Sequence, residues 1–209
     1  MTSVRLMLWK VISIGILVLS PNVGAATAPL EAIRSTVERA RAVLEDPTYQ
    51  GPDQREQRVA KVREILLPQF DSEEIAKRTL GTHWRTRTEE ERKQFIQLFV
   101  DLVEKTYSSN LDRYDPGVKL YFDHERIDGD YAEVDTRIFD PVLDKTFVIN
   151  YRMRKTNGKW LIYDVIAENI SMVRNYRNQF QRILSNSSYQ DLVQKIEMKL
   201  KELSNASPS

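Results

Sequence analysis

Apolar residues that recur every three or four positions predict helices towards both ends of the chain. The longest of them starts at a capping box, where Thr88 and Glu91 can each satisfy a free backbone amide of the first turn. Its apolar stripe runs from Phe95 to Leu111 and stops before Asp115-Pro116-Gly117. With the other caps, prolines and glycines, the pattern predicts helices over 29–45, 53–68, 71–81, 88–115, 170–184 and 188–202.

Between these helical regions the period changes to two, which is typical of strands with one buried face. Asp128-Gly129 and Asn157-Gly158 are dipeptides of tight hairpin turns that need positive φ, so the neighbouring strands run antiparallel. The sequence therefore predicts an antiparallel meander of four strands, over 118–126, 131–139, 146–155 and 159–167.

The alternation also predicts which side chains share a face of this sheet. The apolar face should carry Val118, Leu120, Phe122, Ala132, Val134, Ile138, Phe147, Ile149, Tyr151 and Met153, with Asn150, Arg152 and Arg154 on the opposite face. On the fourth strand, Trp160, Ile162, Asp164 and Ile166 should share one face. The fold class is α+β, a curved four-stranded antiparallel sheet covered by about six to seven helices. Such a roof often leaves a concave apolar cavity between sheet and helices, and a fully packed core is the alternative.

Residues 1–26 have the order of a cleaved Sec-type export signal, with cations first, then an apolar run, then small residues. The apolar run, 11–19, is about half the ~20 residues that a membrane-spanning helix needs. We therefore expect a soluble protein outside the cytoplasmic membrane, with one domain over 27–203 and a disordered tail over 204–209. Removal of Arg5 and Lys10 changes the formal net charge from +1 to near −1, so no basic excess attracts nucleic acid or anionic lipid.

Few residues suggest catalysis or metal binding. The chain has no cysteine, and its two histidines, His83 and His124, lack the spacing of a zinc site, so we expect no metal or cofactor. Asp164 is the one carboxylate of interest, because it stands within an apolar strand where an ionised acid is costly. It is either a general base or a structural acid, bonded to a helix amide or to an arginine such as Arg177.

Cations and aromatic residues alternate over 174–182, in the sequence Arg-Asn-Tyr-Arg-Asn-Gln-Phe-Gln-Arg. Such a pattern can stack on nucleic acid, but an exported chain of neutral charge rarely meets that ligand. At helical spacing, Val173, Tyr176 and Phe180 form an apolar stripe with the arginines beside it. The two remaining interpretations are ordinary helix packing and a polar gate beside a pocket.

Four segments in order resemble the toluene-tolerance family, which contains the periplasmic phospholipid-binding component of the Mla lipid-transport pathway. They are Phe70-Asp71 with the Ile75–Arg85 segment, the Phe95–Tyr107 helix, the Gly158–Val165 strand, and Ile170–Val173 leading to Asn175–Phe180. The resemblance spans about 30–203. It departs from the family at Asn169 and over 186–189, where glycine is expected.

The resemblance implies a periplasmic carrier that moves phospholipid between the outer membrane and an inner-membrane ABC transporter complex, and so maintains outer-membrane lipid asymmetry. Its implied partners are that complex and an outer-membrane lipoprotein/porin complex, and the chain should act as a monomer and not as an enzyme. The acyl tails are expected in the cavity, lined by Trp84, Phe99, Tyr107, Ile149, Tyr151, Met153, Ile162, Met172, Tyr176 and Phe180. Asn175 and Arg177 are candidates for contact with the head group.

Two other functions stay open on the sequence. A curved sheet roofed by helices also occurs in cone-shaped isomerases and hydratases, in which Asp164 would act as the base. A structural adaptor of the cell envelope would need only a packed interior.

Overall fold

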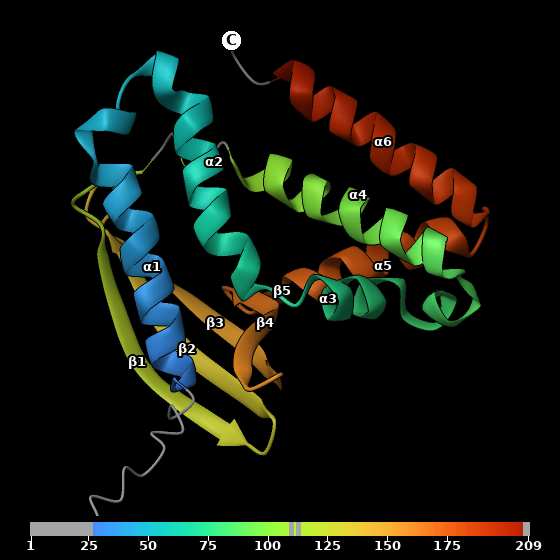
Figure 1. Cartoon of the computed structure of the whole chain (residues 1–209), viewed down its shortest axis with the longest axis horizontal. Helices are drawn as coiled ribbons and strands as arrows, with labels where there is room; N and C mark the ends of the chain where they lie inside the picture. Colours follow the sequence, from blue (N-terminus) through green and yellow to red (C-terminus); the bar gives the residue numbers. More distant parts are fainter. Residues whose placement is uncertain (1–26, 109–110, 112–113, 207–209) are drawn as a thin grey trace, which may run out of the picture.

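The computed structural model describes residues 27–108, 111 and 114–206. The predicted export signal and the end of the predicted tail, 207–209, lie outside these residues. The described residues form six α-helices and one antiparallel sheet (Figure 1). The helices are α1 (Pro29–Glu45), α2 (Arg55–Leu66), α3 (Ser72–Leu80), α4 (Glu89–Ser108), α5 (Met172–Leu184) and α6 (Tyr189–Ala206). Short 3₁₀ turns connect them: η1 (Pro47–Tyr49), η2 (Pro52–Gln54), η3 (Leu67–Gln69) and η4 (Gly81–Thr86).

The sheet has five strands where four were predicted, which confirms the α+β class with one small correction. In spatial and sequence order they are β1 (Lys119–Asp128), β2 (Tyr131–Asp140), β3 (Lys145–Thr156), β4 (Lys159–Ala167) and β5 (Ile170–Ser171). The predicted hairpin turns have positive φ, +57° at Gly129 and +50° at Asn157. Asn169 also has a positive φ of 64°, in the tight turn to β5. Asparagine tolerates this conformation better than most residues, which explains how it can stand where the family resemblance suggests glycine.

Helix limits differ from the prediction at several places. The helix predicted over 53–68 is α2, Arg55–Leu66, with the 3₁₀ turns η2 and η3 at its two ends. The predicted helix 170–184 begins only at Met172, because Ile170 and Ser171 pair with β4 and the Ser171 hydroxyl then caps α5 by accepting the Arg174 amide at 3.0 Å. α4 is described as far as Ser108, and Tyr114, which the prediction places in the same helix, is not helical. α6 continues to Ala206, so residues 204–206, predicted as tail, form its last turn.

The register of β4 corrects the predicted face of Asp164. Arg152 pairs with Asp164 and Met153 pairs with Ile162, so Tyr163 is an extra residue that shifts the register. Trp160 and Ile162 stay on the apolar face, whereas Asp164 and Ile166 turn to the opposite face with Arg152 and Asn150. The bulge thus moves the carboxylate away from the apolar face.

The interior divides into two cores. In the sheet core, Ile33 of α1 packs on Ala132, Val134, Met153, Trp160 and Ile162. The bundle core lies between α3, α4, α5 and α6, beside β4 (Figure 1). Phe70 packs against both cores. The helices therefore do not cover the sheet evenly: α1 lies along it, and the bundle stands at its β4 side.

Candidate functional site

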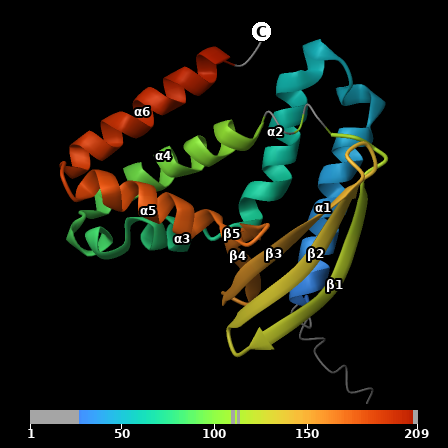
Figure 2. The same cartoon turned by 180° about the vertical axis from the view of Figure 1, so that it is seen from behind.

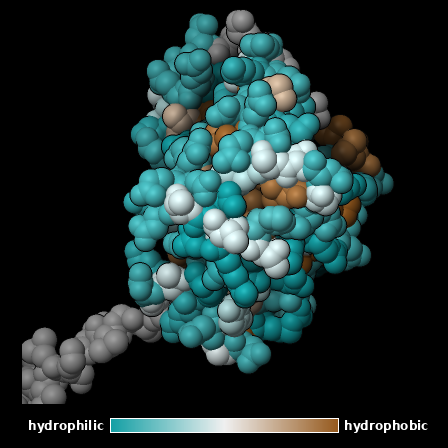
Figure 3. Space-filling model, turned by 90° about the vertical axis from the view of Figure 1, so that its right-hand side faces the viewer, coloured by the Kyte–Doolittle hydropathy of each residue, from teal (hydrophilic) through white to brown (hydrophobic). Residues whose placement is uncertain are grey.

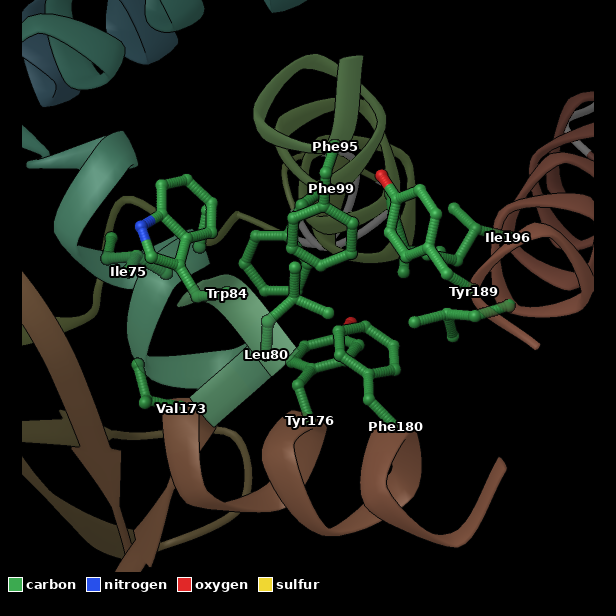
Figure 4. Close-up of a cluster of buried hydrophobic side chains, with 13 residues drawn as sticks. Ile75, Leu80, Trp84, Phe95, Phe99, Val173, Tyr176, Phe180, Tyr189 and Ile196 are labelled. Carbon is green, nitrogen blue, oxygen red and sulfur yellow. The ribbon is translucent and has the colours of Figure 1, made fainter. Parts of the chain in front are cut away.

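Four of the predicted tail-lining residues pack against one another in the bundle core (Figure 4). The Phe99 ring meets the Tyr176 ring edge to face at 5.0 Å, and Tyr176 lies 5.8 Å from Phe180. Trp84 is buried in the same core, and Met172 packs against it. These side chains fill the space between the helices, as in ordinary helix packing. This arrangement favours the packing interpretation for the apolar stripe of residues 174–182.

Three other predicted lining residues belong to the sheet core instead. Met153 and Ile162 are 1% and 3% exposed beneath α1, and the half-buried Tyr151 packs beside them. Burial raises the pKa of the Tyr151 phenol, and its hydrogen bond with Thr136 acts in the opposite direction. Tyr107, at the end of α4, is 46% exposed and belongs to neither core.

Ile149, the last residue of the predicted set, lies where the apolar face is incompletely covered. It pairs with Thr136 on β2, on the same face as Tyr151, yet it is half-buried and packs against neither core. Other half-buried apolar side chains share this property on the same face, at Leu120, Ile138 and Phe147, and at the end of α2, at Leu66 and Leu67. Leu67 opens η3, which leads to Phe70, the bridge partner of Ile162 on β4. We call Ile149, Phe147, Ile138 and Leu120 the uncovered apolar face.

The sequence singled out Ile149 by its alternation but missed Leu66 and Leu67. The signal available was an apolar pair directly before Pro68, at the end of a helix whose apolar residues do not gather on one side.

A polar cavity of about 550 Å³ lies on the opposite face of the sheet, next to the start of α5. This face points towards the viewer in Figure 2, with α1 behind the sheet. Arg177 lines this cavity, on the far side of the sheet from Ile149, and Asn175 is exposed on the same helix. The cavity is lined by Arg78, Glu133, Asn150, Arg152, Tyr163, Asp164, Ile166, Asn169, Ser171, Val173, Arg174 and Arg177.

Glycine at position 81 permits the close approach of Arg177. Gly81 ends α3 with φ +60°, and a Cβ there would lie 3.2 Å from the Arg177 Nε. The Gln181 amide donates to the Leu80 carbonyl at 3.1 Å, so α5 closes the end of α3. The glycine in the Thr-Leu-Gly-Thr-His-Trp segment is thus required by both its φ and its neighbours.

Asp164 has the contacts of a structural acid. One carboxylate oxygen accepts the Ser171 hydroxyl at 2.7 Å, and the other accepts the Val173 amide at 3.1 Å. The nearest cation is Arg152, at 4.0 Å, and not Arg177 as the sequence suggested. Both oxygens therefore hold the start of α5 against β4. This agrees with the structural alternative, in which the carboxylate bonds to a helix amide.

A second cavity, of about 480 Å³, lies between α1, α2 and the segment before β1. Tyr114 donates to Glu45 at 2.6 Å across this cavity, and Arg41 donates to the Pro116 carbonyl at 3.1 Å. Burial, together with the bond to Glu45, raises the pKa of the Tyr114 phenol to about 12. These bonds fasten the end of α1 to the chain that enters the sheet.

Among the described residues, no cluster of three or more His, Asp or Glu side chains is placed to hold a metal ion. No helix in the same part of the chain is long and apolar enough to span a bilayer. Figure 3 shows the side of the molecule where α4, α5 and α6 lie as mainly hydrophilic, with small apolar patches.

Comparison with known proteins agrees with the sequence resemblance. Over 139 residues the chain is 24% identical to the intermembrane phospholipid transport system binding protein MlaC of Haemophilus influenzae, and the match spans 65% of either protein. A phospholipid-binding protein from Ralstonia solanacearum, solved in complex with a phospholipid, has the same fold with a TM-score of 0.72 and 20% identity, covering 83% of this chain and 97% of that one. The model of the MlaC protein family matches residues 34–198. This chain therefore belongs to the MlaC family.

Proposed function

We propose that the protein carries phospholipid, with the acyl tails held against the uncovered apolar face. The observation that carries the proposal is the group of half-buried apolar side chains around Ile149, which pack against neither core. Support also comes from the MlaC relative, named as a phospholipid transport binding protein, and from the fold shared with a protein solved around a phospholipid.

The tails contact Ile149 and Tyr151 directly in this proposal, and they extend towards the half-buried Leu66 and Leu67, where α2 meets η3. Met153 and Ile162 form the floor under α1. Trp84, Phe99, Met172, Tyr176 and Phe180 belong to the bundle core beside β4 and do not line the tail site, and Tyr107 stands at the exposed end of α4. The tail site is thus built from the sheet, and the aromatic bundle supports it.

Physical chemistry explains why a carrier is needed. Two acyl chains hold about 30 methylenes, and exposing them to water costs roughly 25 kcal/mol at ~0.8 kcal/mol each. A protein that moves such a lipid must bury the tails and still release them. This task needs an apolar surface and no covalent chemistry, so neither a catalytic group nor a cofactor is part of the proposal.

The proposed setting follows from the predicted export signal and the family. The mature protein works in the periplasm as a monomer and moves phospholipid between an outer-membrane lipoprotein/porin complex and an inner-membrane ABC transporter complex. Its role there is to maintain the lipid asymmetry of the outer membrane.

Organic extraction of the purified protein tests the proposal, with lipid identification by mass spectrometry. We expect about one phospholipid per chain, and transfer of labelled phospholipid from vesicles to protein that has first been stripped of lipid. Protein that contains no lipid and also takes up none from vesicles would refute the proposal.

A further inference from the structure

We propose that the polar cavity beside α5 is a binding site for a phosphate group. Its lining holds four arginines, Arg78, Arg152, Arg174 and Arg177, against two carboxylates, Glu133 and Asp164. The site is separate from the proposed tail site, because the cavity and Ile149 lie on opposite faces of the sheet.

Internal pairs already neutralise half of the cavity's arginines. Arg78 donates to Glu74 at 2.8 Å and stacks on the Tyr163 ring at 4.2 Å. Arg152 lies 4.0 Å from Asp164. Both oxygens of Asp164 are occupied by the start of α5, so this carboxylate has little capacity left for another arginine.

Two guanidinium groups on α5 remain uncompensated. Within the described parts of the chain, neither Arg174 nor Arg177 has an acidic partner. Arg174 donates only to the Asn169 carbonyl, at 3.4 Å, and the Arg177 Nε lies against Gly81. The remaining carboxylate, Glu133, lies 3.6 Å from Arg126 on the neighbouring strand. The cavity therefore has an excess of positive charge. Arg174 and Arg177 carry it, three residues apart on one face of α5.

The chemistry of the donors selects the ligand class. Guanidinium groups bind phosphate through two parallel N–H···O bonds, with more geometric specificity than an ammonium group provides. Asn150 and Asn169 add neutral polar groups at the same cavity. A volume of about 550 Å³ suits a small phosphate ester better than a folded protein segment. The phosphate belongs either to a free phosphate ester or to a lipid head group.

Titration calorimetry of the purified protein tests this site with sn-glycerol 3-phosphate and inorganic phosphate as probes, and with glycerol as the uncharged comparison. Low salt is needed because charge interactions at an open cavity are screened. We expect saturable binding of both phosphate probes and none of glycerol. Each of Arg174→Gln and Arg177→Gln should weaken binding roughly tenfold or more, as expected for loss of one charge-assisted contact.

Arg182→Gln is the matched control, because Arg182 is exposed on the same helix but lies outside the cavity lining. It removes the same charge and should leave binding unchanged. Arg174→Gln also guards against misfolding, since Arg174 is exposed and does not contact Gly81. Flotation with phosphatidylglycerol vesicles separates the two sources of phosphate: binding that depends on Arg174 and Arg177 assigns the site to a head group, and its absence assigns it to a free ester.

Three results would overturn the inference. They are no saturable binding of either small phosphate, an equal loss in Arg182→Gln, and selective binding of polyglutamate in place of phosphate, which would indicate a docking surface for an acidic protein. None of them affects the proposed tail site, which is measured by lipid uptake.

Discussion

Replacement of Ile149 by aspartate should abolish phospholipid loading while the protein stays folded. Ile149 is half-buried on the uncovered apolar face and packs against neither core. An aspartate there places a short, ionised side chain at the proposed position of the acyl tails, with no stem long enough to reach water. The variant therefore challenges the tail site and spares both cores.

The expected size of the effect follows from the cost of moving charge out of water. An ion held in an apolar environment costs several kcal/mol even after relaxation. Since each 1.4 kcal/mol is a factor of ten, lipid affinity should fall at least about a hundredfold. The folded state itself should lose only about 1–2 kcal/mol, from the weaker strand propensity of aspartate and the lost half-burial of isoleucine.

Val148→Asp is the matched control on the same strand. Val148 points to the opposite face and is 41% exposed, so an aspartate there stays in contact with water. Met153→Asp is unsuitable as a test of lipid loading, because Met153 is 1% exposed inside the sheet core and its replacement should unfold the protein.

The assay is lipid content per chain by mass spectrometry, with circular dichroism and urea unfolding on the same samples. We expect a lipid-free, folded Ile149→Asp variant and a normally loaded Val148→Asp variant. Equal loading of the Ile149 variant and the unaltered protein would refute the assignment of the tails to this face. Equal loss in both variants would point to a general effect of charge on the strand.

Three further predictions concern the groups that hold the elements together. Asp164→Ala should lower the free energy of unfolding by about 1–2 kcal/mol, through loss of the α5 anchor, and leave lipid loading intact; lost loading at unchanged stability would contradict this. Gly81→Ala should cost about 1–3 kcal/mol in urea unfolding, and Gly129→Ala less, because a Cβ at 81 meets Arg177 whereas a Cβ at 129 meets open space at a similar φ. The raised pKa of Tyr114 means that the folded protein keeps this proton while the unfolded chain loses it, so stability should fall as the pH rises from 10.0 through about 12. Tyr114→Phe should remove this part of the alkaline loss in urea midpoints measured across that range, and an unchanged pH profile would show that Tyr114 does not cause it.

Periodicity predicted most of the fold because each element carries its own signal. The hairpins over Gly129 and Asn157 were confirmed, since only a few residue types accept positive φ. The short β5 was missed because two residues carry no period, and only pairing with Ile166 and Ala167 makes them a strand. The predicted face of Asp164 was wrong for a related reason. Tyr163 is an extra residue that shifts the register, and a prediction from strict alternation does not include such a shift.

The candidate site was harder to predict, because apolar character alone does not separate a core from a binding surface. The sequence predicted that Phe99, Tyr176 and Phe180 line a cavity, but their rings fill the bundle core. Ile149 has the same character and packs against neither core. The difference depends on where α1 and the bundle lie on the sheet, which is a property of long-range packing. The arginines of the polar cavity come from three separate segments, α3, β3 and α5, and only the packing of both helices beside the sheet brings them together.

Phe70 and Asp71 connect the bundle core with the sheet core. Phe70 contacts both cores, and Asp71 caps α3 while it accepts Arg154 of β3 at 2.6 Å. Amide hydrogens of the helical bundle and of the sheet should therefore exchange with solvent as two groups with separate protection. A ligand that contacts both cores would couple their opening, so that their amide hydrogens exchange as one group. The bound ligand would then determine the rigidity of the protein.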